Sequence, residues 1–142
     1  KSEIVRKDEK EKNLRMVLNF GHTFAHGFEG AKNFSKKLNH GESVLLGMMM
    51  ASQLAYQKKL LPLNDLNLIK NHYKDLSLPS QIKKIFNKKE IEKIIFFMKK
   101  DKKNIDDKIN LILLKRIGET TKPNSFKVTN KEIKKFLLEK FN

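Results

Sequence analysis

The chain contains no cysteine and no tryptophan among its 142 residues, and it has only three prolines and three arginines. Without cysteine there is no disulfide framework and no thiolate metal site, so any metal must be held by nitrogen and oxygen ligands. No run approaches the roughly 20 apolar residues of a membrane span, and no secretory signal pattern is present. We therefore expect no membrane association and a cytoplasmic location. Because the first residue is Lys1, we also expect a piece of a longer polypeptide.

The formal net charge of +15 suggests nucleic-acid binding at first sight. Of the 31 basic residues, however, 28 are lysine and three are arginine. Arginine is the residue that reads bases and clamps phosphates with two parallel hydrogen bonds. We therefore expect solvated lysine-rich faces and no nucleic-acid partner. The alternative, a non-catalytic basic module, would bind its acidic partner with a steep salt dependence.

The first apolar pattern predicts a helix from about Leu14 through Glu29, with Asn13 as its N-cap. Gly21 and Gly27 lie inside it, and each costs about 1 kcal/mol relative to alanine. Glycine at such positions usually marks the close approach of another backbone or a ligand. A loop from residue 30 to residue 38 follows.

Cap residues predict where the later helices begin. Asn39 followed by Glu42 resembles a capping box, and it opens an almost wholly apolar helix containing VLLGMMMASQLAY, which we expect to be buried. We interpret its three methionines, Met48 to Met50, as hydrophobic core residues. Three further helical segments are predicted at residues 64–76, 80–86 and 88–100, and the last of them is capped by Asn87 with Glu90.

The hydrophobic period changes after residue 107. KINLILLKRIG and SFKV read as two short strands, most simply a hairpin. Thr129 with Glu132 caps a terminal helix whose apolar residues share one face. The fold class predicted for residues 1–142 is therefore mainly α: one multihelical domain with a single small β-hairpin.

Histidines are the clearest candidates for chemistry. His22 and His26 are four residues apart, so they lie on one helix face at a spacing that suits two imidazoles on one zinc ion. Such pairs are more often structural, each ring being satisfied by a neighbouring carbonyl or carboxylate. If the next helix packs antiparallel across the short loop, His40 at its start reaches the first helix, and three nitrogens can converge. His72 reads as a surface or core-edge residue.

Several motifs follow one another in the sequence: an arginine seven residues before the histidine of GHT, then GHTxxH, HGE with GM five residues on, and DKKN before a strand. Together they resemble the C-terminal domain of the 3-dehydroquinate synthase family from Lys1 to about Gly118. Members of that family join an N-terminal NAD-binding domain to a helical domain. The departures are small: GHTFGHA reads GHTFAHG here, with Ala25 and Gly27, and HGEAV has Ser43. No ligand position is lost.

The resemblance implies roles for individual residues. His22 and His40 match two zinc ligands, and the third ligand is a glutamate upstream of Lys1, outside this chain. His26 matches a residue that contacts the substrate and assists proton transfer. Residues that hold the carboxylate, hydroxyls or phosphate of the substrate match Lys1, Arg15, Asn19 and Lys102.

The family reaction converts 3-deoxy-arabino-heptulosonate 7-phosphate into 3-dehydroquinate and phosphate in the shikimate pathway. The resemblance implies zinc or another divalent metal such as cobalt, NAD held mainly by the N-terminal domain, and a homodimer of the full-length enzyme. Two enzyme alternatives stay open. One is another sugar-phosphate cyclase, such as an inosose- or valiolone-forming enzyme. The other is an iron- or zinc-dependent alcohol dehydrogenase, against which Arg15, Asn19 and Lys102 favour an acidic, phosphorylated substrate.

Alanine substitutions separate the two interpretations of the histidines. In the parent enzyme, His22→Ala and His40→Ala should abolish both zinc content and turnover, because each removes a ligand. His26→Ala should retain zinc while losing rate. Metal analysis and a steady-state assay of the purified variants measure both. Loss of zinc in His26→Ala with zinc retained in His40→Ala would instead favour the HxxxH pair as the metal site.

Overall fold

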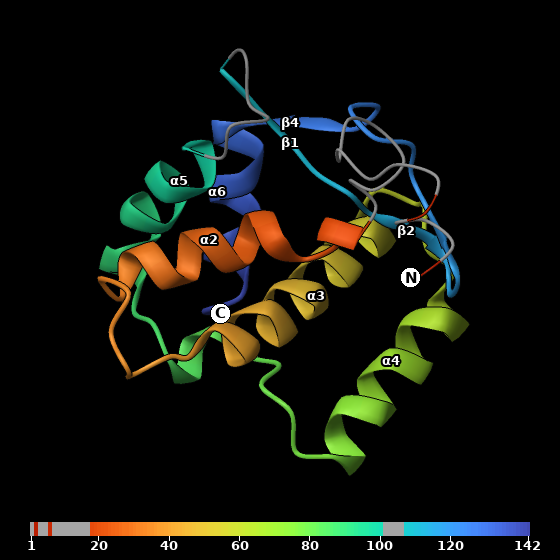
Figure 1. Cartoon of the computed structure of the whole chain (residues 1–142), viewed down its shortest axis with the longest axis horizontal. Helices are drawn as coiled ribbons and strands as arrows, with labels where there is room; N and C mark the ends of the chain where they lie inside the picture. Colours follow the sequence, from red (N-terminus) through yellow and green to blue (C-terminus); the bar gives the residue numbers. More distant parts are fainter. Residues whose placement is uncertain (1, 3–5, 7–17, 101–106) are drawn as a thin grey trace.

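The described part of the chain is built mainly from helices. This computed structural model describes residues 2, 6, 18–100 and 107–142. The predicted fold class, multihelical with a small antiparallel strand pairing, is confirmed (Figure 1). The helices are α2 (His22–Ala31), α3 (His40–Gln57), α4 (Leu63–Asp75), α5 (Ile91–Lys99) and α6 (Asn130–Glu139), with short 3-10 helices η2 (Ile82–Lys84) and η3 (Lys88–Glu90).

The strands form two small antiparallel pairs rather than one hairpin. β1 (Lys108–Asn110) pairs with β4 (Lys127–Thr129), as the sequence predicts. Between them, β2 (Leu114–Arg116) pairs with β3 (Glu119–Thr120) in an inner hairpin that the pattern did not predict. Its turn contains Gly118 at φ 90°, a left-handed conformation that glycine adopts without strain.

The prediction of one continuous helix up to Glu29 is wrong around Gly21. There the backbone has φ 82° and ψ −14°, which is left-handed, so the chain turns and α2 begins only at His22. Residues 18 and 19 form a short 3-10 turn before it. The predicted start of the helix at residues 14–17 lies outside the described residues. A glycine that looked like a weak point inside a helix therefore marks where α2 starts.

α2 and α3 run antiparallel and touch through their backbones (Figure 1). A Cβ atom added to Gly47 would lie 2.2 Å from the carbonyl oxygen of Gly21, and one added to Gly21 would lie 2.7 Å from the backbone nitrogen of Met48. At the other end, Asn39 caps α3, because its side-chain oxygen accepts the Glu42 N–H at 2.8 Å. The close backbone approach predicted at Gly21 is therefore confirmed.

α5 packs against a different side of α2, again at glycine. A Cβ atom on Gly27 would lie 2.8 Å from the Ile94 carbonyl oxygen, and one on Gly30 would lie 2.1 Å from the Phe97 ring. Only glycine leaves room for this spacing unless α5 shifts. The small residues of α2 thus let two helices approach it closely.

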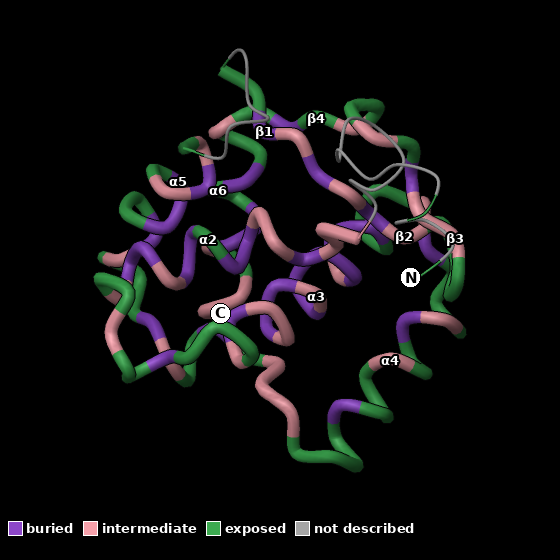
Figure 2. Tube along the Cα trace, in the orientation of Figure 1, coloured by how far each residue is buried: buried purple, intermediate pink, exposed green. Residues whose placement is uncertain are grey.

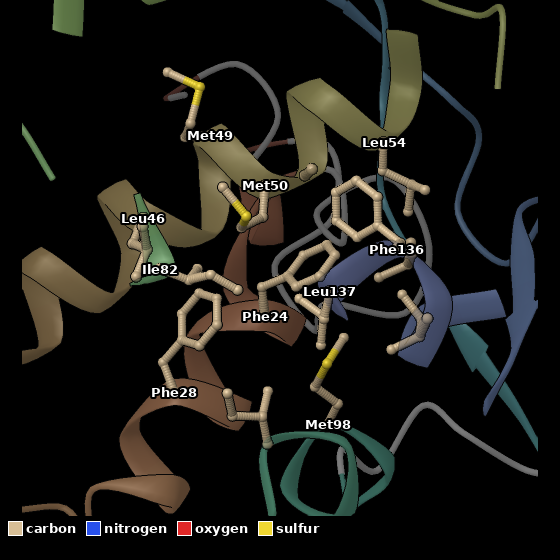
Figure 3. Packing of buried hydrophobic residues seen from close by; sticks show 14 of the residues in the cluster. Phe24, Phe28, Leu46, Met49, Met50, Leu54, Ile82, Met98, Phe136 and Leu137 are labelled. Carbon is tan, nitrogen blue, oxygen red and sulfur yellow. The ribbon is translucent and has the colours of Figure 1, made fainter. Parts of the chain in front are cut away.

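The hydrophobic core lies between α2, α3, α5 and α6, and Figure 3 shows how it packs. Phe24 and Phe28 of α2 are fully buried. The Phe24 ring lies 6.1 Å from that of Phe136 on α6, and the Phe28 ring lies 5.3 Å from that of Phe86, measured between centroids. In Figure 2 the buried positions of α2 and α3 alternate with exposed or half-buried ones, as amphipathic helices require. Met49 and Met50 belong to this core, as predicted.

α4 covers the core only at its edge, and most of its residues are exposed (Figure 2). It is attached to α3 by Tyr73, whose hydroxyl donates to the Leu45 carbonyl oxygen at 2.6 Å. Burial raises the pKa of Tyr73 to about 12, so the hydroxyl keeps its proton near neutral pH. The exposed His72 lines an apolar cavity of about 300 Å³ between α3, α4 and the inner hairpin, which agrees with the predicted core-edge position.

Within the described ranges, no helix has the length and apolar character needed to cross a membrane.

Replacing Gly47 by alanine should destabilise the fold, because the new methyl group would overlap the Gly21 carbonyl oxygen. We expect a loss of about 1–3 kcal/mol in the free energy of unfolding, typical of overpacked interiors. Urea unfolding followed by circular dichroism measures it. Gly41→Ala in the same helix is the matched control, since its methyl would meet only the Asn39 side-chain oxygen at 3.5 Å. Equal midpoints for the two variants would contradict the role given to Gly47.

Candidate functional site

One face of α2 carries the polar side chains that point away from the core. His22, His26 and Glu29 are spaced by four and three residues, so they follow one another along a single stripe of the helix. The core residues Phe24 and Phe28 lie on a different face. The burial of those two rings therefore fixes the direction in which the stripe faces.

The structure brings His22 and His40 together. Their ring centroids lie 5.9 Å apart, with the ring planes inclined at 60°. His40 is the first residue of α3, and the antiparallel packing of α3 on α2 carries it to the stripe. His26 lies one turn beyond His22 and is exposed. Imidazoles from two different helices are thus neighbours at this site.

Both neighbouring imidazoles have their Nδ1 atoms engaged. His22 Nδ1 lies 3.4 Å from the Phe20 carbonyl oxygen, and His40 Nδ1 lies 2.5 Å from Oε1 of Glu29. Carbonyl and carboxylate oxygens accept hydrogen bonds, so each Nδ1 carries the proton. In a neutral ring this leaves the Nε2 lone pair available, which is the arrangement common among metal-binding histidines.

The donor set fits part of a zinc site. Two neutral imidazole nitrogens are ligands that zinc accepts, but a tetrahedral site takes at least one more protein ligand. Among residues 18–100 and 107–142, no group of three histidine, aspartate, glutamate or cysteine side chains converges to hold a metal. The resemblance predicts that the third ligand is a glutamate upstream of Lys1. The described residues therefore supply the two imidazoles and not the complete site.

Of the predicted substrate residues, the structure describes only Asn19. It is half-buried in the turn before Gly21, three residues ahead of His22. The other three, Lys1, Arg15 and Lys102, lie outside the described residues. The structure therefore leaves all four assignments as predictions.

Sequence reasoning missed Glu29, the residue that binds His40. Its position seven residues after His22 and three after His26 is a signal that could have drawn attention to it. A glutamate on a helix is common, however, and its partner is set by how α3 packs. Glu29 joins the site only once the two helices are seen together.

Two residues that differ from the family motifs, Ala25 and Ser43, are buried in the packed interior and do not take part in the contacts of the two imidazoles. Ala25 is fully buried, and its N–H donates to the Gly21 carbonyl oxygen at 3.0 Å. Ser43 is also fully buried, and its hydroxyl oxygen has no hydrogen-bond partner in the described part of the chain. Neither side chain replaces a donor atom of the site.

Comparison with known proteins identifies the family of the chain. The family profile described as 3-dehydroquinate synthase C-terminal matches residues 1–104. The chain belongs to the 3-dehydroquinate synthase family. It is 51% identical over 118 residues to the 3-dehydroquinate synthase of Pelagibacter ubique, covering 83% of this chain and 32% of that protein. The enzyme of Agrobacterium fabrum is 36% identical over 142 residues, covering 99% of this chain and 37% of its own length.

Solved structures of sugar-phosphate cyclases share the fold. A 2-epi-5-epi-valiolone synthase from Streptomyces hygroscopicus with NAD+ and Zn2+ bound superimposes with a TM-score of 0.73 at 26% identity, covering 97% of this chain and 36% of that one. A 2-deoxy-scyllo-inosose synthase complexed with carbaglucose-6-phosphate, NAD+ and Co2+ gives 0.68 at 26% identity, covering 91% and 35%. The chain thus spans about a third of the length of the proteins it matches.

A site with two imidazoles should bind zinc only weakly in the 142-residue chain. We expect a dissociation constant in the micromolar range or weaker by competition with a chromophoric chelator, because the resemblance predicts a third ligand, a glutamate, that lies upstream of Lys1. His22→Ala and His40→Ala should weaken the binding further, while His72→Ala on α4 should leave it unchanged. Tight stoichiometric binding by this chain alone would mean that its own residues complete the site.

Proposed function

We propose that this chain is the metal- and substrate-binding C-terminal part of a 3-dehydroquinate synthase, which converts 3-deoxy-arabino-heptulosonate 7-phosphate into 3-dehydroquinate and phosphate. The observation that carries the proposal is the pairing of His22 and His40 across α2 and α3, in a chain whose curated relatives bear that name. The net charge of +15 also suits an acidic, phosphorylated substrate.

In this proposal, Nε2 of His22 and Nε2 of His40 hold a zinc or cobalt ion. Two structural relatives containing NAD+ with Zn2+ or Co2+ support this choice. When bound, such an ion supplies Lewis-acid polarisation of a substrate oxygen. The two histidines must be neutral to bind it, so metal affinity falls as the pH drops toward the imidazole pKa.

His26 is proposed as the residue that moves a proton. It is exposed on the same stripe of α2, one turn beyond His22, so its ring can reach a substrate bound beside the metal ligands. An imidazole titrates near neutral pH and can therefore accept a substrate proton at a ring nitrogen and return it. This separates proton transfer from metal binding on neighbouring turns of one helix.

The remaining residues are proposed to hold the substrate. The guanidinium of Arg15 presents paired N–H donors that match a carboxylate, and the ammonium groups of Lys1 and Lys102 are point charges suited to phosphate or carboxylate oxygens. The Asn19 side chain, in the turn before α2, is proposed for a substrate hydroxyl. These assignments follow the family motifs.

The rest of the reaction is proposed to need a segment beyond this chain. The curated relatives are about three times longer, and the proposal places NAD and the glutamate ligand in their N-terminal part. The 142 residues alone should therefore give no turnover.

Another sugar-phosphate cyclase is the second candidate. The two solved relatives named above are, by their printed names, an inosose synthase and a valiolone synthase, and both share the fold at 26% identity. Because both candidate enzymes would use the same histidines, only the substrate that is converted distinguishes one activity from the other.

Substrate assays of the full-length enzyme with NAD and zinc test the proposal. 3-Deoxy-arabino-heptulosonate 7-phosphate should release phosphate and form 3-dehydroquinate, whereas glucose 6-phosphate and sedoheptulose 7-phosphate should not react. Coupled phosphate detection and chromatography of the product measure both. Turnover of either sugar phosphate without 3-dehydroquinate would favour the second candidate, and turnover by the 142-residue chain would contradict the need for an upstream segment.

A further inference from the structure

We propose that Glu29 is a positioning residue that orients the His40 imidazole for metal binding. The observation is the contact of 2.5 Å between Oε1 of Glu29 and Nδ1 of His40, which joins the last turn of α2 to the first residue of α3. The inference rests on the proposed function, because it concerns how one of the two imidazoles is held.

Glu29 is the fixed member of the pair. Its side chain is 14% exposed, whereas that of His40 is 65% exposed. Its neighbours hold the backbone in place, since Phe28 is fully buried and Gly30 packs against the Phe97 ring. The Glu29 carbonyl oxygen also accepts the Phe34 N–H at 2.8 Å. The carboxylate is therefore enclosed at a packed helix end and contacts an exposed ring.

An exposed ring at the start of a helix needs such a restraint. A carboxylate on Nδ1 fixes both the tautomer and the plane of the imidazole, and it leaves Nε2 as the atom that can bind a metal. The corresponding contact of His22 is longer, with Nδ1 lying 3.4 Å from the Phe20 carbonyl oxygen. α2 and the turn before it thus supply the acceptors for both imidazoles, one from the backbone and one from a side chain.

Two other roles for Glu29 fit the geometry less well. As a metal ligand it would have to converge with both histidines, and the described residues contain no such group of three. As an ordinary surface ion pair it would be exposed, yet the carboxylate is the enclosed partner. Glu42 offers the contrast: it lies two residues from His40 on α3, but its carboxylate accepts from the Asn39 side chain at 2.6 Å.

The test compares Glu29→Gln, Glu29→Ala and Glu42→Gln in the full-length enzyme. Glutamine keeps an acceptor for Nδ1–H but not the charge, and alanine removes both. Glu42→Gln is the matched control, because it removes the same charge close to His40 and a glutamine oxygen can still accept from the Asn39 side-chain amide. Each protein is measured for zinc affinity by chelator competition, for zinc stoichiometry, and for the visible absorption bands of the cobalt-substituted form.

Loss of an outer carboxylate typically weakens metal binding by about 10- to 100-fold. We expect about tenfold for Glu29→Gln and a loss nearer 100-fold for Glu29→Ala, with one metal still bound at saturation and shifted cobalt bands. Glu42→Gln should match the wild type. If Glu29→Ala does not fold, Glu29→Gln carries the comparison, checked by thermal unfolding of its metal-free form.

Three results would overturn the assignment. Wild-type affinity in both Glu29 variants would show that the contact positions nothing. Loss of the metal altogether, as in His40→Ala, would make Glu29 a ligand. An equal loss in Glu42→Gln would trace the effect to charge and not to the contact. A wild-type enzyme that takes up no zinc is a separate outcome, since it overturns the proposed function and the role of Glu29 together.

Discussion

The backbone contact between Gly21 and Gly47 is the constraint on which the site depends. Because no side chain separates the two helices there, the register of α2 against α3 is fixed at that point. Gly21 and Glu29 are eight residues apart, and His40 and Gly47 are seven apart. In an antiparallel pair both intervals span about two turns, so the end of α2 arrives at the start of α3. The meeting of Glu29 with His40 follows from the glycine contact.

The sequence predicts best those parts of the fold whose cause is local. The boxes at Asn87 and Thr129 were recognised because cap chemistry involves only residues three apart, and both are present in the structure. The predicted helix at residues 80–86 is only a 3-10 turn over three of them. The break at Gly21 was missed because its left-handed backbone lies against Met48 of another helix. The inner hairpin was missed because its strands are very short.

Some contacts of the candidate site could likewise be predicted from the sequence, and others depend on how the helices pack. The approach of His40 to α2 could be anticipated, since a short loop favours antiparallel neighbours, and the structure shows the two rings together. Glu29 could not be singled out, because only the packing of α3 distinguishes it from other helical glutamates. The roles of His26 and Asn19 come from the family motifs alone. A contact between side chains of two helices, such as that of Glu29 with His40, can be identified only from the structure in which both helices are packed.

Gly27 has a consequence for how this chain relates to its family. The usual family motif has alanine at this position and glycine two residues earlier, whereas here the two are exchanged. A Cβ atom on Gly27 would lie 2.8 Å from the Ile94 carbonyl oxygen, so α5 sits too close for the common residue. Alanine at position 27 would therefore require α5 to shift, so the residue at this position and the packing of α5 on α2 constrain each other.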